Sequence, residues 1–271
     1  MSSNLIRRIE EQMGRAIPQV LLSDLHSNKI AYHSEGSRVL ALSLRGCGLQ
    51  QVPGAVWDLE SLQVLSLGEN KIEELPGQIS QLSHLRQFYL FNNPISELPE
   101  EIGELPELEI LDIGHKALTS IPESVSNLKK LQFLYVSDNK LSALPYSLGE
   151  LDSLIYLSMT DNQFTELPAV VCELRSLKEL RIYNNKITQL PDAIGQLSEL
   201  RELHARGNRL SQLPEEIGEL HNLYYLDLRG NLLSKLPESL GKLKELRKLD
   251  LRWNKVEKIT ILKNPELIIY T

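Results

Sequence analysis

The sequence has few cysteines and no long apolar run, and both shortages exclude classes of protein. Its 271 residues include two cysteines, Cys47 and Cys172, far apart along the chain. We expect both to be reduced thiols, as is usual in the cytoplasm. No segment reaches the roughly 18 apolar residues of a membrane span, and residues 1–11 lack the apolar run of a secretory signal peptide. These absences predict a cytoplasmic protein.

The sequence also has no excess of positive charge. Its 29 Lys and Arg residues face 36 Asp and Glu residues, which gives a net charge of −7. Nucleic-acid-binding proteins usually carry a basic patch or stripe, and anionic membranes attract basic surfaces. We therefore expect neither a nucleic acid nor a membrane as partner.

Signatures of catalysis are equally scarce. The sequence contains no G-x-x-x-x-G-K-[S/T] phosphate-binding loop. The six histidines show no metal-ligand spacing, and the pair Asp112 and His115 is more typical of a solvated turn than of a metal or acid–base site. We expect no catalytic residue, no metal site and no cofactor, and hence no enzyme.

What the sequence does contain is a repeat with a constant period of 23 residues. Residues 62–82 show the unit, L-x-x-L-x-L-x-x-N-x-L-x-x-L-P-x-x-I-x-x-L. Nine prolines mark the period, at Pro53, Pro76, Pro99, Pro122, Pro145, Pro168, Pro191, Pro214 and Pro237. A period of this length with this leucine pattern is typical of a leucine-rich repeat solenoid.

The repeat predicts an α/β fold in which each coil supplies one strand and one short helical turn. Apolar pairs such as Leu65 and Leu67 alternate with polar residues and therefore predict a strand with one buried face. The proline has a fixed φ and no N–H, which suits the first turn of a helix. We expect a curved horseshoe with a concave parallel sheet of about ten strands and helical turns on the convex side.

Three segments are expected. Residues 1–36 form an N-terminal cap and connector, with a helix from Asn4 to about Ala16 that either covers the first coil or binds a partner. Residues 37–259 hold nine full repeats and a partial tenth. Residues 260–271 are either a C-terminal cap or the point where a longer protein was cut.

A column of asparagines follows the predicted strands. We expect their amides to satisfy backbone groups that each turn leaves open. Cys47 and Lys116 depart from this column, and replacing Lys116 with Asn is expected to stabilise the chain by about 1 kcal/mol. The asparagines are Asn70, Asn93, Asn139, Asn162, Asn185, Asn208, Asn231 and Asn254.

The outward positions of the strands carry two groups of candidate partner-binding residues. One group is aromatic, and exposed tyrosines often anchor partners, although neighbouring rings can also simply cover one another. The aromatic group comprises Tyr89, Phe91, Phe133, Tyr135, Tyr156 and Tyr183.

The other group is an arginine column near the C-terminus. The guanidinium fork suits a carboxylate-rich or phosphorylated segment. The alternative is a solvated lattice in which Glu179, Glu202, Asp227 and Asp250 pair with the arginines across strands. The arginines are Arg181, Arg206, Arg229 and Arg252.

The 23-residue unit resembles the intracellular leucine-rich repeats of Ras-pathway scaffolds, Scribble-type polarity proteins and many bacterial proteins. That resemblance implies a non-enzymatic scaffold that binds a protein domain or peptide on its concave face. The opening residues 5–18, followed by residues 37–49, are also similar to the start of prokaryotic Roco proteins, in which repeats precede a Ras-like GTPase. This second resemblance implies an alternative, a regulatory repeat domain that acts on a GTPase region in the same or another chain.

Overall fold

The computed structural model describes the whole chain except residues 1, 26, 116 and 258–263. It divides into two compact units, residues 1–135 and residues 136–271, here called the N-terminal and C-terminal units. Among the described residues, no helix is both long enough and apolar enough to span a bilayer.

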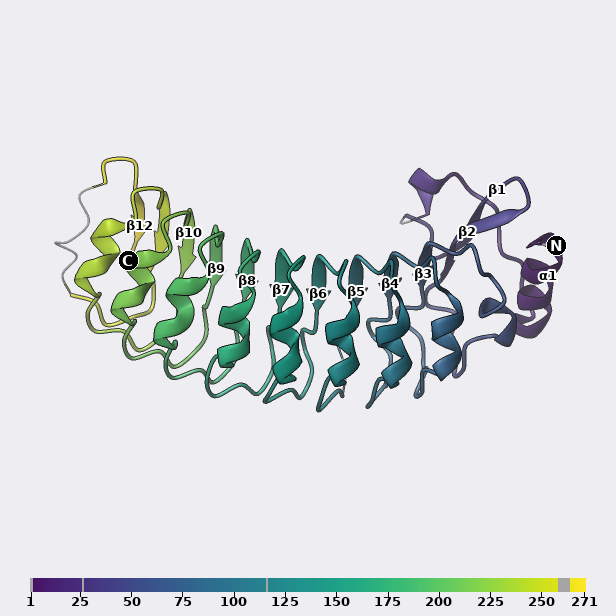
Figure 1. The fold of residues 1–271 in the computed structure, drawn as a ribbon, viewed down its shortest axis with the longest axis horizontal. Helices are drawn as coiled ribbons and strands as arrows, with labels where there is room; N and C mark the ends of the chain where they lie inside the picture. The colour runs from purple at the N-terminus through teal and green to yellow at the C-terminus, as the bar shows by residue number, and fades with distance from the viewer. Residues whose placement is uncertain (1, 26, 116, 258–263) are drawn as a thin grey trace. The chain divides into compact units, whose positions relative to one another are not determined.

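In the N-terminal unit a helix and an antiparallel hairpin precede a parallel sheet (Figure 1). The helix is α1 (Ser2–Met13), and the hairpin joins β1 (Ile30–Glu35) to β2 (Arg38–Leu44). The parallel strands follow in chain order as β3 (Val64–Ser66), β4 (Gln87–Tyr89), β5 (Ile110–Asp112) and β6 (Phe133–Tyr135). Short 3₁₀ turns alternate with them: η1 (Leu22–Asp24), η2 (Gly54–Val56), η3 (Gly77–Gln81), η4 (Glu100–Glu104) and η5 (Glu123–Asn127).

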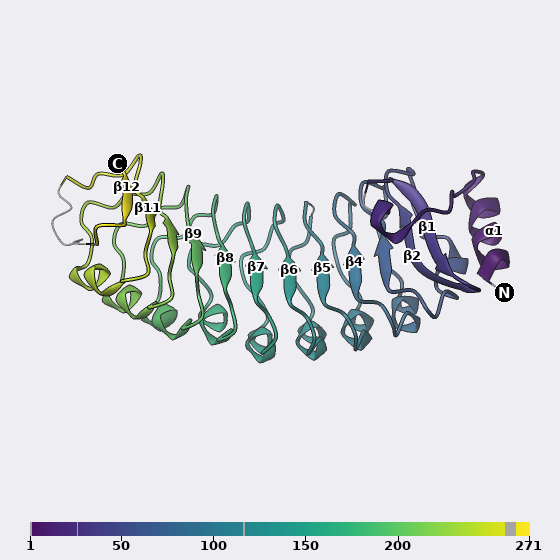
Figure 2. The ribbon, with the colours of Figure 1, turned by 90° about the horizontal axis from the view of Figure 1, so that it is seen from above.

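The C-terminal unit repeats the same arrangement without a hairpin. Its strands all pair in parallel and in chain order: β7 (Tyr156–Ser158), β8 (Glu179–Arg181), β9 (Glu202–His204), β10 (Tyr225–Asp227), β11 (Lys248–Asp250) and β12 (Ile268–Tyr270). Its turns are η6 (Tyr146–Glu150), η7 (Ala169–Glu173), η8 (Asp192–Gln196), η9 (Glu215–Glu219) and η10 (Glu238–Lys242). In Figure 2 each turn lies on the side of its coil away from the strand.

One coil shows why the sequence folds this way. Leu65 and Leu67 of the strand segment are fully buried, as are Ile79 and Leu82 of the turn. The N–H of Ile79 donates to the carbonyl of Pro76 at 3.1 Å, which is the i to i+3 bond of a 3₁₀ turn. Strand and turn therefore close on one apolar core, and the predicted leucine-rich repeat solenoid is confirmed as the fold.

The asparagine column connects neighbouring coils as expected. Asn185 Nδ2 donates to the carbonyls of Met159 at 3.0 Å and Ile182 at 3.1 Å, and its Oδ1 accepts from the N–H of Phe164 at 3.2 Å. Cys47 occupies the corresponding position in the first coil, where its own N–H donates to Asn70 Oδ1 at 2.9 Å. Lys116, the other exception, lies outside the described residues.

The N-terminal segment contains more structure than the sequence indicated. Residues 1–36 were predicted as a cap and connector with one helix and no assigned strand, yet residues 30–35 form β1, which pairs antiparallel with β2. The strand is short and lies outside the repeat, so no periodicity marks it. Helix α1 packs against η2 and buries Ile6 and Ile9. Near the other end of the chain, β12 continues the sheet beyond β11.

The asparagine column gives a direct stability test. Asn185→Ala removes one accepted and two donated hydrogen bonds to buried backbone groups. The free energy of unfolding should therefore fall by about 2–3 kcal/mol. Asn222→Ala is the matched control, because the Asn222 amide makes one exposed bond to the carbonyl of Ser198. Urea unfolding followed by circular dichroism measures both, and equal midpoints for the two variants would contradict the structural role of Asn185.

Candidate binding surface on the sheet

The candidate site is the solvent-facing side of the sheet, here called the sheet surface. Successive side chains of a strand point to opposite faces. In β8, Leu180 is fully buried while Glu179 and Arg181 are partly exposed on the other face. The sheet surface therefore consists of the outward side chains of each strand, together with the outward side chains among the next two residues.

In the N-terminal unit three residues spaced one repeat apart, Arg45, Gly68 and Phe91, form a stack. Phe91 lies over Gly68, where an added Cβ would come within 2.7 Å of the ring. The guanidinium carbon of Arg45 lies 5.1 Å from the centre of the same ring. Phe91, predicted as a partner anchor, therefore contacts its own neighbours, and Gly68 leaves the space that this contact needs.

The connector covers the start of this surface. Leu25 is 2% exposed and packs with Ala31, Ala41 and Val64, while Tyr89 packs against the same cluster. A pocket of about 220 Å³ remains beside it. The lining residues are Leu25, Asn28, Ser43, Arg45, Val64, Ser66, Tyr89, Phe91 and Asp112.

The pKa values of two carboxylates in this region are shifted in opposite directions. Burial raises the pKa of Asp112, and its hydrogen bond from the N–H of Gly114 at 3.1 Å only partly opposes this. At the edge of the unit, hydrogen bonds from Arg45 and then Lys29 lower the pKa of Glu69 to about 2. Asp112 is thus a half-buried carboxylate in the pocket, and among the residues that the structure describes no lysine or arginine lies within ion-pair distance of it. The two remaining predicted aromatic residues of this unit, Phe133 and Tyr135 of β6, are partly exposed.

In the C-terminal unit the predicted tyrosines lie beneath arginines. The guanidinium of Arg181 lies 5.5 Å from the ring centre of Tyr156, and that of Arg206 lies 4.6 Å from Tyr183. These distances are typical of cation–π contacts. The structure thus brings together four of the residues that the sequence predicted as two separate groups.

The same pattern continues into residues that the sequence analysis missed. Lys248 Nζ lies 4.4 Å from the ring centre of Tyr225 and 5.7 Å from that of Tyr270. Arg252 also lies over Tyr270, at 5.3 Å. Tyr225 and Lys248 occupy the same position in adjacent repeats, so comparison of neighbouring repeats could have found this pair.

The expected pairing of the arginines with acids across strands is largely wrong. Arg229 and Arg252 each bind the aspartate two positions earlier, Asp227 and Asp250, at 2.6 Å. Arg181 binds Glu179 in the same way, also at 2.6 Å. Residues i and i+2 share a face of a strand, so the long arginine side chain can fold back onto its own strand. Arg229 also makes a longer contact across strands, with Nε 3.5 Å from Oδ2 of Asp250.

These aspartates are almost inaccessible, with side chains 2% and 1% exposed for Asp227 and Asp250. Burial is the largest influence on Asp250 and acts to raise its pKa, yet the hydrogen bonds from Arg252 hold that pKa below its usual value. Arg206 differs from its neighbours. It is exposed, and no carboxylate of the described part of the chain lies within ion-pair distance of it.

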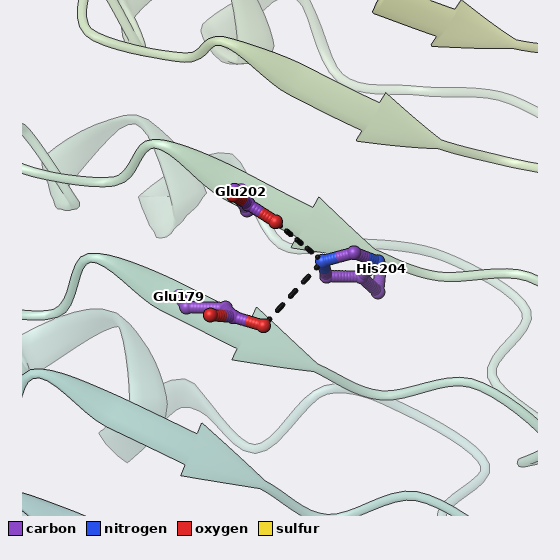
Figure 3. Close-up of side chains that lie close together, drawn as sticks. All are labelled: Glu179, Glu202 and His204. Carbon is purple, nitrogen blue, oxygen red and sulfur yellow. Dashed lines mark hydrogen bonds and ion pairs between the residues drawn. The ribbon is translucent and has the colours of Figure 1, made fainter.

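A mixed cluster of two carboxylates and one imidazole lies on β8 and β9 (Figure 3). His204 Nε2 is 3.0 Å from Glu202 Oε2 and 3.6 Å from Glu179 Oε1. One ligand atom from each side chain lies within 4.8 Å of the others. The sequence analysis found no metal-ligand spacing because Glu179 and Glu202 are one full repeat apart and meet only through strand pairing.

Comparison with solved structures gives neighbours among receptors. The plant peptide hormone receptor RGFR1, solved in complex with RGF2, is 33% identical over 79% of this chain, with a TM-score of 0.68. The Arabidopsis receptor kinase HAESA, solved with the peptide hormone IDA and the co-receptor SERK1, is 27% identical over 82%, with a TM-score of 0.72. The chain spans 36% and 40% of those two chains.

A bacterial neighbour shares the fold alone. The functional domain of InlJ from Listeria monocytogenes is 21% identical over 86% of this chain and 53% of its own, with a TM-score of 0.69. No curated protein sequence matches the chain.

The sequence itself matches two family descriptions. Residues 37–95 and 152–210 match "Leucine rich repeat", and residues 77–160 and 194–267 match "Leucine-rich repeat region". The second match extends over more than half of the chain and includes strands and turns of both units. This chain belongs to the leucine-rich repeat family.

Proposed function

We propose that this chain is a non-enzymatic scaffold that binds a protein domain or peptide on its sheet surface, the face that the repeat pattern predicts to be concave. The observation that carries the proposal is the set of tyrosines that lie beneath cations in the C-terminal unit. Tyrosine and arginine are the residues most often responsible for binding energy at protein interfaces. The peptide complexes of RGFR1 and HAESA support a partner of this kind.

The contacts of Arg206 suggest how such a partner would be oriented. Its guanidinium rests on Tyr183, so both side chains are partly ordered before binding and lose less conformational entropy on contact. Arg229 and Arg252 already bind aspartates. Arg206 is therefore the arginine best able to bind a carboxylate of the partner, with Tyr156 and Tyr183 as apolar anchors.

The N-terminal unit supplies a second contact region, the pocket beside Tyr89 and Phe91. Asp112 is half-buried there, burial raises its pKa, and carboxylates with perturbed pKa values cluster at functional sites. A cationic group of the partner would neutralise it. Two cysteines that are both free support the further proposal of a cytoplasmic location.

An alternative proposal is that these repeats regulate the GTPase region of a larger Roco-type protein. The opening of the chain supports it, because residues 5–18 resemble the Roco start, and α1, which includes residues 5–13, packs on the first coil and buries Ile6 and Ile9. Reading the gene downstream of Thr271 tests this alternative. A G-x-x-x-x-G-K-[S/T] strand–helix unit there would favour it, and its absence would reject it.

Substitution of tyrosines tests the scaffold proposal. Tyr135→Ala and Tyr156→Ala, singly and together, should weaken capture of protein partners from an extract of the native cells, with the double variant losing at least about tenfold, because each ring typically contributes one or more kcal/mol. Tyr146→Ala is the matched control, since Tyr146 is 77% exposed on η6, away from the sheet surface. Quantitative mass spectrometry of the captured proteins is the measurement. Equal capture by the double variant and the wild type would contradict the proposal that partners bind to the sheet surface.

The half-buried carboxylate of Asp112 gives a pH-dependent prediction. Because the pKa of folded Asp112 is raised, its ionisation opposes folding as the pH rises from the unfolded pKa through the folded one. Asp112→Asn should therefore raise the urea midpoint at pH 7, and this gain should vanish below about pH 4, the usual pKa of aspartate. Asp152→Asn, an exposed control, should change the midpoint little at either pH. A lower midpoint for Asp112→Asn at pH 7 would contradict the assignment.

A further inference from the structure

We propose that Glu179, Glu202 and His204 form a binding site for a divalent transition-metal ion of the zinc class on the sheet surface of the C-terminal unit. The proposal depends only on these side chains and their neighbours, and it does not depend on a protein partner. It assigns a ligand to a cluster that the partner-binding proposal leaves without a role (Figure 3).

Strand pairing places the two carboxylates together. Glu179 of β8 and Glu202 of β9 are direct partners in the parallel register. Like charges directly opposite each other on a sheet are destabilising, so this pair requires positive charge nearby. Arg181 supplies part of it through its 2.6 Å bond to Glu179, while Glu202 faces the imidazole of His204.

The spacing of the ligand atoms suits a metal ion. At metal–ligand distances of about 2.0–2.1 Å, the donors of a tetrahedral site lie about 3.3–3.4 Å from one another. The observed separations from His204 Nε2 are 3.0 Å to Glu202 Oε2 and 3.6 Å to Glu179 Oε1, on either side of that value. Small side-chain rotations would bring all three atoms to a common ion.

Burial and neighbouring contacts hold the three ligands in place. The side chain of His204 is 15% exposed, that of Glu179 is 24% exposed and that of Glu202 is 41% exposed. The imidazole lies edge to face against Tyr225, with 5.1 Å between ring centres. Arg181 Nε donates at 2.6 Å to Glu179 Oε1, the same oxygen that faces His204, so this carboxylate would keep a hydrogen-bonded partner while it binds the ion.

The donor set determines the class of ion. One imidazole nitrogen with two carboxylate oxygens favours Zn²⁺ and its neighbours Co²⁺ and Ni²⁺, whereas Mg²⁺ and Ca²⁺ prefer oxygen ligands alone. Three protein ligands leave the fourth position of a tetrahedral ion open.

Calorimetric titration of the metal-free full chain with ZnCl₂ tests the proposal. We expect about one tight site per chain, and Co²⁺ should produce the visible absorption of a low-coordinate site. His204→Ala and Glu202→Gln should each weaken Zn²⁺ binding at least about tenfold, while circular dichroism stays unchanged. Glu202→Gln preserves side-chain shape, so it separates loss of a ligand from loss of folding.

His221→Ala is the matched control, because His221 is exposed and lies 3.5 Å from a single carboxylate, Glu219. That variant should bind Zn²⁺ as the wild type does. The proposal is overturned if the wild type binds no more tightly than His204→Ala, if His221→Ala abolishes binding, or if Ca²⁺ competes equally with Zn²⁺ for the site.

Discussion

Most coils of this protein are connected to the preceding coil by the side-chain amide of one asparagine, and the packing of the repeats depends on these amides. The side chain of Asn208 shows the arrangement, since it donates to the carbonyls of Ile182 and Ala205 and accepts from the N–H of Ile187. Backbone groups in a turn cannot pair within a sheet ladder, and a buried unpaired group is costly. The amide supplies both a donor and an acceptor at the one place where both are needed. The leucines then fill a core of constant width.

Because adjacent coils are held in register, residues that are 23 positions apart in the sequence lie side by side on neighbouring strands. Arg45, Gly68 and Phe91 form one such row, in which the missing side chain of Gly68 gives the ring its place. Glu179 and Glu202 form another, and their mutual repulsion is relieved by groups on the same two strands. The binding properties of the sheet surface therefore follow from lateral rows as much as from the order of residues along the chain.

Cations on this surface are used in two different ways. Arg229 and Arg252 neutralise aspartates that are almost wholly buried, which is a structural role. Arg206 instead lies on the ring of Tyr183 and remains exposed. A column that looks uniform in sequence thus divides into arginines paired with aspartates and one arginine that lies on a tyrosine ring and stays exposed.

The sequence alone determined the repeat, the inward leucines, a short helical turn after each proline and the asparagine column, because each of these follows from a local pattern of fixed period. It did not determine β1, which lies outside the repeat, or the arginine pairing within strands, which depends on how a long side chain folds back. Nor did it show that His204 meets two glutamates. That cluster exists only because strand register brings Glu179 beside Glu202, and register between coils is a property of the tertiary structure.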